Sequence, residues 1–135
     1  DTITLLNNNK PYLIETWNES CKPCLKSIKE LQNKLSIDTT FNHIYLYQKK
    51  GFNLSKTDHI TNFQLIQDKS KIWFDTNHQL YDSLELKSYP YFLVFDSKGK
   101  LVDFQNGYHS DYKDSILARI FMLVEKAKYS SKISF

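Results

Sequence analysis

The two cysteines of this chain, Cys21 and Cys24, are separated by two residues, and this pair constrains the fold more than any other feature. An apolar run at 12–17 precedes them and a helical pattern follows, which predicts a strand that leads into a helix. The first sulfur would then lie among the unpaired backbone N–H groups of the helix N-terminus, which favour thiolate over thiol. Lys22 adds a positive charge, so we expect a lowered pKa for the Cys21 thiol. The pattern indicates a redox pair with Cys21 as the nucleophile.

The second cysteine belongs to the apolar face of the helix expected at 21–35. Side chains at steps of four, three and four residues share that face: Cys24, Ile28, Leu31 and Leu35. Pro23 falls in the first turn, where a missing N–H costs no helical hydrogen bond. We therefore expect the Cys21 thiolate to attack a disulfide and Cys24 to resolve the mixed disulfide that forms.

Three other interpretations of the cysteine pair compete with a redox site. A zinc site needs about four ligands, and the histidines are scattered at His43, His59, His78 and His109. A structural disulfide across two residues would constrain almost no loop. Two unrelated buried thiols would not require the flanking strand and helix pattern.

Glu15 is the one acidic residue in the apolar run at 12–17. One interpretation is an exposed carboxylate on a half-open strand. The other is a buried carboxylate beneath Cys24 that accepts its proton during resolution. We favour the second.

The length of 135 residues fits one domain, which we expect at 1–128, followed by a frayed tail at 129–135. The net charge is +3 and the lysines are dispersed, which is typical of a solvated surface rather than of a nucleic-acid interface. No apolar run approaches the roughly 18 residues of a membrane span. The sequence begins at Asp1 without a signal-peptide pattern, so we expect either that a targeting or anchor segment has been removed or that the chain has been shortened.

Strand and helix patterns alternate along the rest of the chain. Strands are expected at 2–6, 12–17, 41–48, 71–74, 91–95 and 101–104, and helices at 21–35, 55–67, 76–86 and 111–128. The strand at 41–48 should lie parallel to that at 12–17, and within it His43 is interpreted as a strand-entry residue rather than a ligand. Tyr89, Tyr91 and Tyr108 form an aromatic rim around Cys21 in one interpretation, and in the other simply reflect the nine tyrosines of the chain.

This order of elements resembles the thioredoxin superfamily, and specifically its TlpA/ResA-like branch of envelope thiol-disulfide oxidoreductases. The resemblance extends from about residue 10 to residue 128. It rests on Trp17, the CxPC motif, the Tyr89-Pro90 strand entry, the hairpin turn at 96–100 and Gly107. It implies an α/β thioredoxin fold, with a central mixed β-sheet flanked by helices and the CxxC at the N-terminus of the first helix.

The resemblance also implies roles for individual residues. Pro90 matches the family's cis-proline, which lies against the CxxC and prevents metal binding, and the backbone of Tyr89 would pair with the extended chain of the substrate. Glu15 matches the position of a buried acidic or amide residue. The implied catalytic residues are Cys21, Cys24, Glu15 and Pro90. The implied substrate-binding residues are Trp17, Ser20, Lys22, Pro23 and Tyr89.

Four positions depart from the pattern of that branch. Ser20 replaces the usual aromatic residue, Ser27 a frequent glutamate, Lys29 a helix-kinking proline and Tyr89 a smaller side chain. These departures leave the redox potential and the partner open.

The sequence and the resemblance together predict a thiol-disulfide oxidoreductase that reduces disulfides of protein partners and is itself supplied with electrons by an upstream redox protein. No cofactor is expected, because the cysteine pair carries the two electrons, and no metal or nucleic acid is expected either. We expect a monomer in the cell envelope or periplasm, with the cytoplasm also compatible, and membrane contact only through a removed anchor. The alternatives are a disulfide-donating oxidant, a thioredoxin-like interaction module with a regulatory or vestigial cysteine pair, and metal delivery, which Pro90 disfavours.

Overall fold

The computed structural model describes residues 8–48 and 63–132. The strand expected at 2–6 lies outside the described residues, as does most of the helix expected at 55–67. Of that helix, the described part is a 3₁₀ turn, η2, at Phe63–Leu65.

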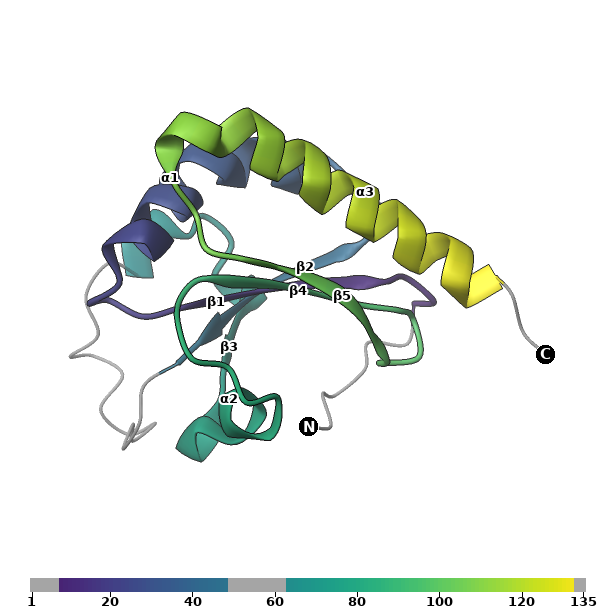
Figure 1. Cartoon of the computed structure of the whole chain (residues 1–135), viewed down its shortest axis with the longest axis horizontal. Coiled ribbons are helices and arrows are strands. Elements are labelled where there is room, and N and C mark those ends of the chain that lie inside the picture. The colour runs from purple at the N-terminus through teal and green to yellow at the C-terminus, as the bar shows by residue number, and fades with distance from the viewer. Residues whose placement is uncertain (1–7, 49–62, 133–135) are drawn as a thin grey trace.

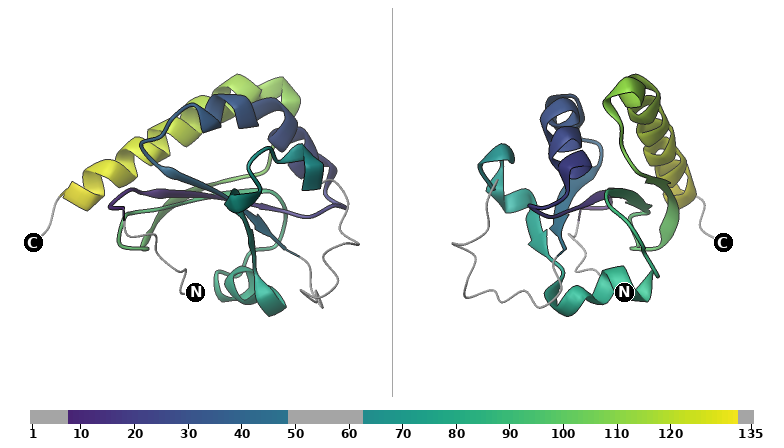
Figure 2. Two further views of the ribbon diagram at one scale, coloured as in Figure 1. Left: turned by 180° about the vertical axis from the view of Figure 1, so that it is seen from behind. Right: turned by 60° about the vertical axis from the view of Figure 1, so that its left-hand side comes forward.

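A mixed five-stranded sheet in the order β3-β2-β1-β4-β5 forms the centre of the molecule. The first three strands are parallel, and β4 and β5 run antiparallel to their neighbours. Two long helices, α1 and α3, lie over one face of the sheet, and the short α2 lies on the other (Figures 1 and 2). The bounds are β1 Tyr12–Trp17, α1 Lys22–Ser36, β2 Asn42–Tyr47, β3 Ile72–Phe74, α2 Gln79–Ser83, β4 Tyr91–Phe95, β5 Leu101–Asn106 and α3 Lys113–Lys132.

The five strands expected within the described residues are all present, and the thioredoxin fold class is confirmed. The helix expected at 76–86 is shorter. Asn77 and His78 have positive φ within the 3₁₀ turn η4, at Thr76–His78, so α2 begins only at Gln79, and Glu85, also with positive φ, follows its end. The closing helix α3 extends to Lys132. The first part of the tail expected at 129–135 is therefore helical, and the remainder lies outside the described residues.

β1 is buried along its whole length and pairs with β2 on one side and β4 on the other. Side chains of a strand alternate between the two faces of its sheet. Leu13 packs with residues of α3 and Trp17 with residues of α1, whereas Tyr12 and Ile14 pack with Leu80 of α2. This alternation places Glu15 on the face that α1 and α3 cover.

The two edge strands, β3 and β5, are protected in different ways from pairing with a further strand. β3 is only three residues long. On β5, the backbone N–H of Phe104 donates to Oδ1 of Asp103, and the carbonyl oxygen of Phe104 accepts a hydrogen bond from Arg119 of α3 at 3.2 Å. Short length and bonded backbone groups both limit pairing with a further strand.

A candidate redox site at the start of the first helix

Cys21 and Cys24 form a disulfide at the point where β1 leads into α1. Cys21 is the N-cap of α1, and its Sγ accepts a hydrogen bond from the backbone N–H of Cys24 at 3.2 Å. The positive end of the helix dipole and an N–H donor therefore both point at this sulfur. Both features stabilise a negative charge, so the reduced site favours a Cys21 thiolate.

The two cysteines differ in their access to solvent. Cys24 is 0% exposed and packs with Ile28 and Trp17, whereas Cys21 is partly exposed. An external thiol or disulfide can therefore reach Cys21 but not Cys24. This asymmetry is what an attacking and a resolving cysteine require.

Trp17 supports the motif from inside the protein. Its side chain is 0% exposed and makes an edge contact with Tyr47, with ring centroids 5.3 Å apart. The expectation that Trp17 contacts substrate is therefore corrected, because a fully buried ring cannot reach a partner's chain. Ser20, by contrast, is exposed beside the motif, where its backbone N–H donates to Oδ1 of Asn18.

The peptide bond between Tyr89 and Pro90 is cis, as the resemblance implied. Pro90 is buried, and its carbonyl oxygen accepts a hydrogen bond from the N–H of Gly107 at 2.8 Å. The Tyr89 ring packs, as Cys21 does, against the buried cluster that contains Trp17 and Cys24, and it stacks on Tyr81, with centroids 5.1 Å apart. Burial is the main reason that the pKa of Tyr89 is raised to about 12, so its hydroxyl remains protonated at neutral pH.

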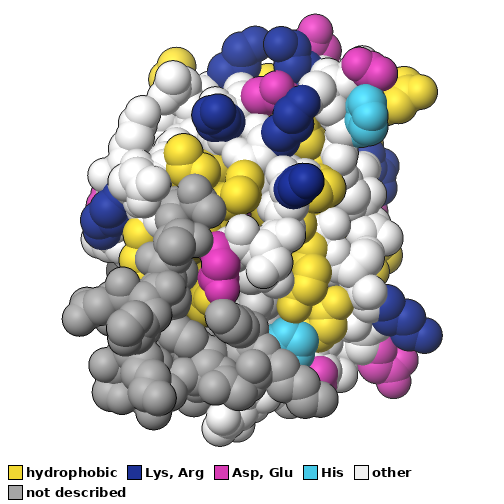
Figure 3. Space-filling view, turned by 90° about the vertical axis from the view of Figure 1, so that its left-hand side faces the viewer, with side chains coloured by type: hydrophobic (Ala, Val, Ile, Leu, Met, Phe, Trp, Pro, Cys, Tyr) yellow, Lys and Arg dark blue, Asp and Glu magenta, His cyan; other side chains and the backbone are white. Residues whose placement is uncertain are grey.

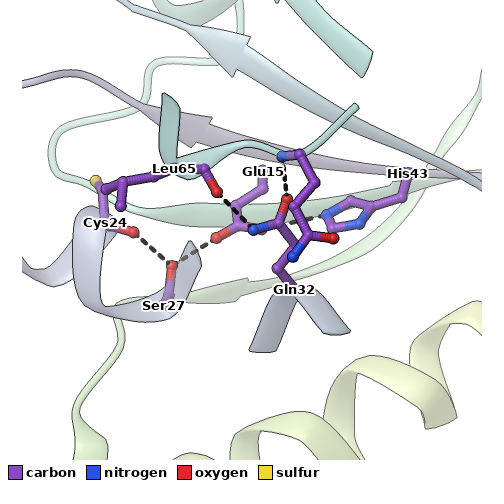
Figure 4. A network of polar contacts seen from close by, with 7 residues as sticks. Glu15, Cys24, Ser27, Gln32, His43 and Leu65 are labelled. Atoms are coloured by element: carbon purple, nitrogen blue, oxygen red, sulfur yellow. Dashed lines mark hydrogen bonds and ion pairs between the residues drawn. The ribbon is translucent and has the colours of Figure 1, made fainter. Parts of the chain in front are cut away.

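Glu15 is 1% exposed and lies at the centre of a buried polar network (Figure 4). The hydroxyl of Ser27 is 2.5 Å from Oε1 of Glu15 and 3.0 Å from the carbonyl oxygen of Cys24. On the other side of the carboxylate, Nε2 of His43 lies 3.2 Å from Oε2. The expectation of a buried Glu15 is therefore confirmed, and one hydroxyl connects its carboxylate to the backbone of the resolving cysteine.

Sequence reasoning missed Ser27 and His43 as members of this network. Ser27 lies on the same helical face as Cys24 and Leu31, and all three are buried. His43 lies at the start of β2, as expected, and it is also 3% exposed and contacts Glu15. Strand alternation could have found it, since His43 lies two residues before Tyr45, the register partner of Glu15.

Comparison with known proteins decides the family. The family model described as a thioredoxin-like domain matches residues 1–118. The chain belongs to the thioredoxin-like family. Its CxxC disulfide at the start of α1 makes this thioredoxin-like protein a thiol-disulfide oxidoreductase.

Solved structures share the fold of the thioredoxin-like chain. A proposed thiol:disulfide interchange protein, DsbE from Chlorobium tepidum, aligns with a TM-score of 0.64 at 15% identity, over 86% of this chain and 81% of that one. The exposed lipoprotein thioredoxin Etrx1 from Streptococcus pneumoniae aligns with a TM-score of 0.60 at 23% identity, over 84% and 85%. A thioredoxin-like protein in its oxidised form aligns with a TM-score of 0.59 at 25% identity, over 87% and 80%. No curated protein matches the chain.

A small hollow of about 190 Å³ lies beside the disulfide of this thioredoxin-like protein. Lys22, Pro23 and Lys26 of α1 line one side of it, and Tyr108, His109 and Ser110 line the other. Figure 3 views this end of the molecule and shows lysine side chains gathered beside hydrophobic ones. Lys22 and Pro23 are exposed, so both can contact a partner.

Tyr108 of the thioredoxin-like protein connects the segment after β5 to α1. Its hydroxyl donates to Oε1 of Glu30, and the hydroxyl of Ser110 donates to Oε2 of the same carboxylate. Both hydrogen bonds lower the pKa of Glu30, and the bond from Tyr108 has the larger effect. Tyr91, in contrast, packs in the same buried cluster as Ile14 and Leu80 of α2, and its ring also contacts that of Phe104. The aromatic rim of three tyrosines is therefore corrected, because Tyr91 faces the opposite side of the sheet.

Within the described ranges 8–48 and 63–132, no group of three or more histidine, cysteine, aspartate or glutamate side chains is arranged to hold a metal ion. None of the helices described there has the length and the apolar character needed to cross a membrane.

Proposed function

We propose that this protein reduces disulfides in partner proteins. The observation that carries the proposal is the unequal access to the two sulfurs, with Cys21 partly exposed at the helix N-terminus and Cys24 fully buried. Pro23 and Glu15 resemble the residues of reducing members of the family, whereas Lys22 stabilises the thiolate and acts in the opposite direction. The redox potential therefore decides the direction.

The reaction begins when the Cys21 thiolate attacks one sulfur of a partner disulfide. A bond forms between Cys21 and that sulfur, the partner's S–S bond breaks, and the other partner sulfur leaves as a thiolate. Cys24 then loses its proton and attacks the sulfur of Cys21. The Cys21–Cys24 disulfide forms, and the partner leaves with its second thiolate. The partner gains two electrons and this protein loses two, so an upstream redox protein must reduce it again.

Glu15 is the proposed acceptor of the Cys24 proton. Glu15 lies buried at 1% exposure beside the motif, and a carboxylate can act as a general base. The Ser27 hydroxyl, bonded to Glu15 and to the Cys24 carbonyl, holds the carboxylate at the buried end of the motif. Proton transfer by a positioned carboxylate contributes typically about 10²- to 10⁴-fold to a rate.

The exposed surface next to Cys21 is the proposed docking site for the partner. The backbone of Tyr89, which precedes the cis peptide bond, would pair with an extended segment of the partner, and Ser20, Lys22 and Pro23 would contact its side chains. The positive charges of Lys22 and Lys26 beside the hollow favour binding of a partner segment that carries acidic residues.

We further propose that the protein acts in the cell envelope or periplasm as a single domain and a monomer. One protein of similar structure, at 23% identity, is an exposed lipoprotein thioredoxin, and this similarity supports a location outside the cytoplasm. Residues 1–128 remain the proposed extent of the domain.

The test is the redox potential of the Cys21–Cys24 pair, measured by equilibrating the protein with thiol buffers and trapping the free thiols. A value near about −250 mV or lower is expected for a reductase. A value above about −150 mV would reverse the proposed direction and indicate a disulfide donor. Failure to reduce insulin, with a Cys21 that alkylates like an ordinary thiol, would indicate an interaction module instead.

A further inference from the structure

The proposed proton acceptor has no direct contact with solvent. Glu15 is 1% exposed, and its carboxylate contacts the Ser27 hydroxyl on one oxygen and the His43 imidazole on the other. A proton taken from Cys24 must leave this carboxylate before the next turnover. A serine hydroxyl is not protonated at neutral pH, whereas an imidazole accepts a proton on one nitrogen and releases it from the other.

His43 has the geometry that such a transfer requires. Nε2 lies 3.2 Å from Oε2 of Glu15, and the residue is 3% exposed. For Nδ1, the described part of the chain supplies no hydrogen-bond partner. Burial of an unpartnered ring nitrogen costs free energy, so its retention next to a buried carboxylate indicates a use.

His43 also lines a second hollow, of about 430 Å³, far along β2 from the disulfide. The hollow lies between the end of α1 and the start of β3, and exposed residues such as Thr39 and Ser70 open it to solvent. His43 therefore contacts Glu15 and also lines a hollow that opens to solvent on the side away from the partner.

The charged and titratable groups around His43 come from several elements. Lys10, Asp38 and Lys71 line the hollow, and Glu15 faces the ring from β1.

The centroid of the Tyr45 ring lies 4.4 Å from that of the His43 imidazole. Burial, and secondarily the charge of Glu15, raise the pKa of Tyr45, so its hydroxyl stays protonated. The Thr40 hydroxyl lowers the pKa of Asp38, so that carboxylate stays ionised. Neither group competes with His43 for the transferred proton at neutral pH.

We propose that His43 is a positioning residue that acts through Glu15 and carries its proton to the hollow at the edge of β2. The inference rests on the proposed function. Cys24 gives its proton to Glu15 as its thiolate attacks Cys21. Glu15 then gives that proton to Nε2 of His43, and Nδ1 releases its own proton toward the hollow. Glu15 returns to its carboxylate, and His43 changes from its Nδ1–H to its Nε2–H tautomer, which proton exchange with water must reverse before the next turnover.

The experiment follows the reduced protein as it reacts with 5,5′-dithiobis(2-nitrobenzoate) in stopped flow across a range of pH. The first coloured thiolate reports attack by Cys21, and the second reports resolution by Cys24. His43→Gln keeps an amide N–H that can bond to Glu15 but cannot carry a proton onward. Tyr45→Phe is the matched control, because it removes, on the same strand and face, a buried hydroxyl to which the described residues offer no hydrogen-bond partner.

His43→Gln is expected to leave the first phase unchanged, to slow the second about tenfold, and to flatten the pH dependence of the rate of that second phase. Tyr45→Phe should keep the wild-type profile. Glu15→Gln should slow the second phase at least as much, and adding His43→Gln to it should change nothing further. A wild-type second phase in His43→Gln, or additive effects in the double variant, overturns the inference.

Failure of the proposed function is read separately, as a redox potential in the range of a disulfide donor, because such a donor would still show both phases with this reagent. If His43→Gln does not fold, as judged by circular dichroism, His43→Ala with added imidazole replaces it. Recovery of the second phase with imidazole supports the relay, because the neighbouring hollow admits a molecule of that size, and a second phase that imidazole does not change overturns it.

Discussion

The Ser27 hydroxyl lies 2.5 Å from Oε1 of Glu15 and 3.0 Å from the carbonyl oxygen of Cys24. Cys24 and Ser27 are one helical turn apart on α1, and Glu15 is on β1. A single buried side chain therefore couples the position of the resolving cysteine to that of the carboxylate on the neighbouring strand (Figure 4).

Replacing Ser27 with alanine should destabilise the oxidised protein. The variant leaves a buried carboxylate without one of its hydrogen bonds, and a hydrogen bond to a charged group is worth about 1.5–3 kcal/mol. Urea denaturation should show a loss of that size in the free energy of unfolding. Ser36→Ala is the control on the same helix, where the exposed hydroxyl bonds to the carbonyl of Asn33, and should cost less than about 0.5 kcal/mol. Equal losses in the two variants would contradict the coupling.

Replacing Cys24 with serine should trap the partner. Cys21 can still attack, but the mixed disulfide has no resolving thiol and accumulates. Non-reducing electrophoresis with a disulfide-containing protein such as insulin should show a covalent complex that a reductant removes. Cys21→Ser should give none, because Cys24 is fully buried. A complex of equal yield in Cys21→Ser would show that the two sulfurs are equally accessible.

Neutralising Lys22 should make Cys21 less reactive at low pH. The exposed ammonium lies next to Cys21 in the chain and favours the thiolate, so Lys22→Gln should raise the pKa of the Cys21 thiol by about half a unit or less, the size typical of an exposed charge. Iodoacetamide alkylation of the reduced protein against pH measures it. Lys29→Gln, an exposed lysine further along α1, should leave the profile unchanged. A shift of the same size there would point to net charge rather than position.

The contact between Tyr108 and Glu30 predicts a dependence of stability on pH. The bond lowers the pKa of Glu30 from its ordinary value of 4.5. The stabilisation is therefore present above that value and is lost as the pH falls through the lower pKa of the folded state. Tyr108→Phe should be less stable than wild type at neutral pH.

Urea denaturation between about pH 7 and pH 3.5 measures this difference, which should shrink toward the acid end. Tyr112→Phe, at a side chain that is 64% exposed, should show no such trend. A difference between Tyr108→Phe and wild type that stays constant across the range would show that packing, rather than the carboxylate, accounts for the loss.

The sequence predicted the elements whose side chains repeat with a clear period. β1, β2 and α1 follow from alternating or helical apolar positions, and the buried Glu15 follows from its place in such a run. The roles of Ser27 and His43 did not follow, because a polar residue on a buried face can be identified only when its partner on another element is known. The sequence left open whether Tyr91 belongs to an aromatic rim around Cys21. Phe92 and Val94, which alternate with it, pack on the side of α3, so Tyr91 lies on the other face.

The protected edges of the sheet bear on how this protein avoids unwanted partners. At β5, Asp103 and Arg119 occupy the backbone groups that an added strand would need at Phe104, and β3 offers only three residues for pairing. Extended polypeptides are the proposed substrates, and an unfolded chain is also the molecule most prone to join an open sheet edge. At these places a client chain finds few free backbone groups to pair with. Its attachment to the protein then depends on the exchangeable sulfur bond and on the proposed docking site beside Cys21, rather than on the edges of the sheet.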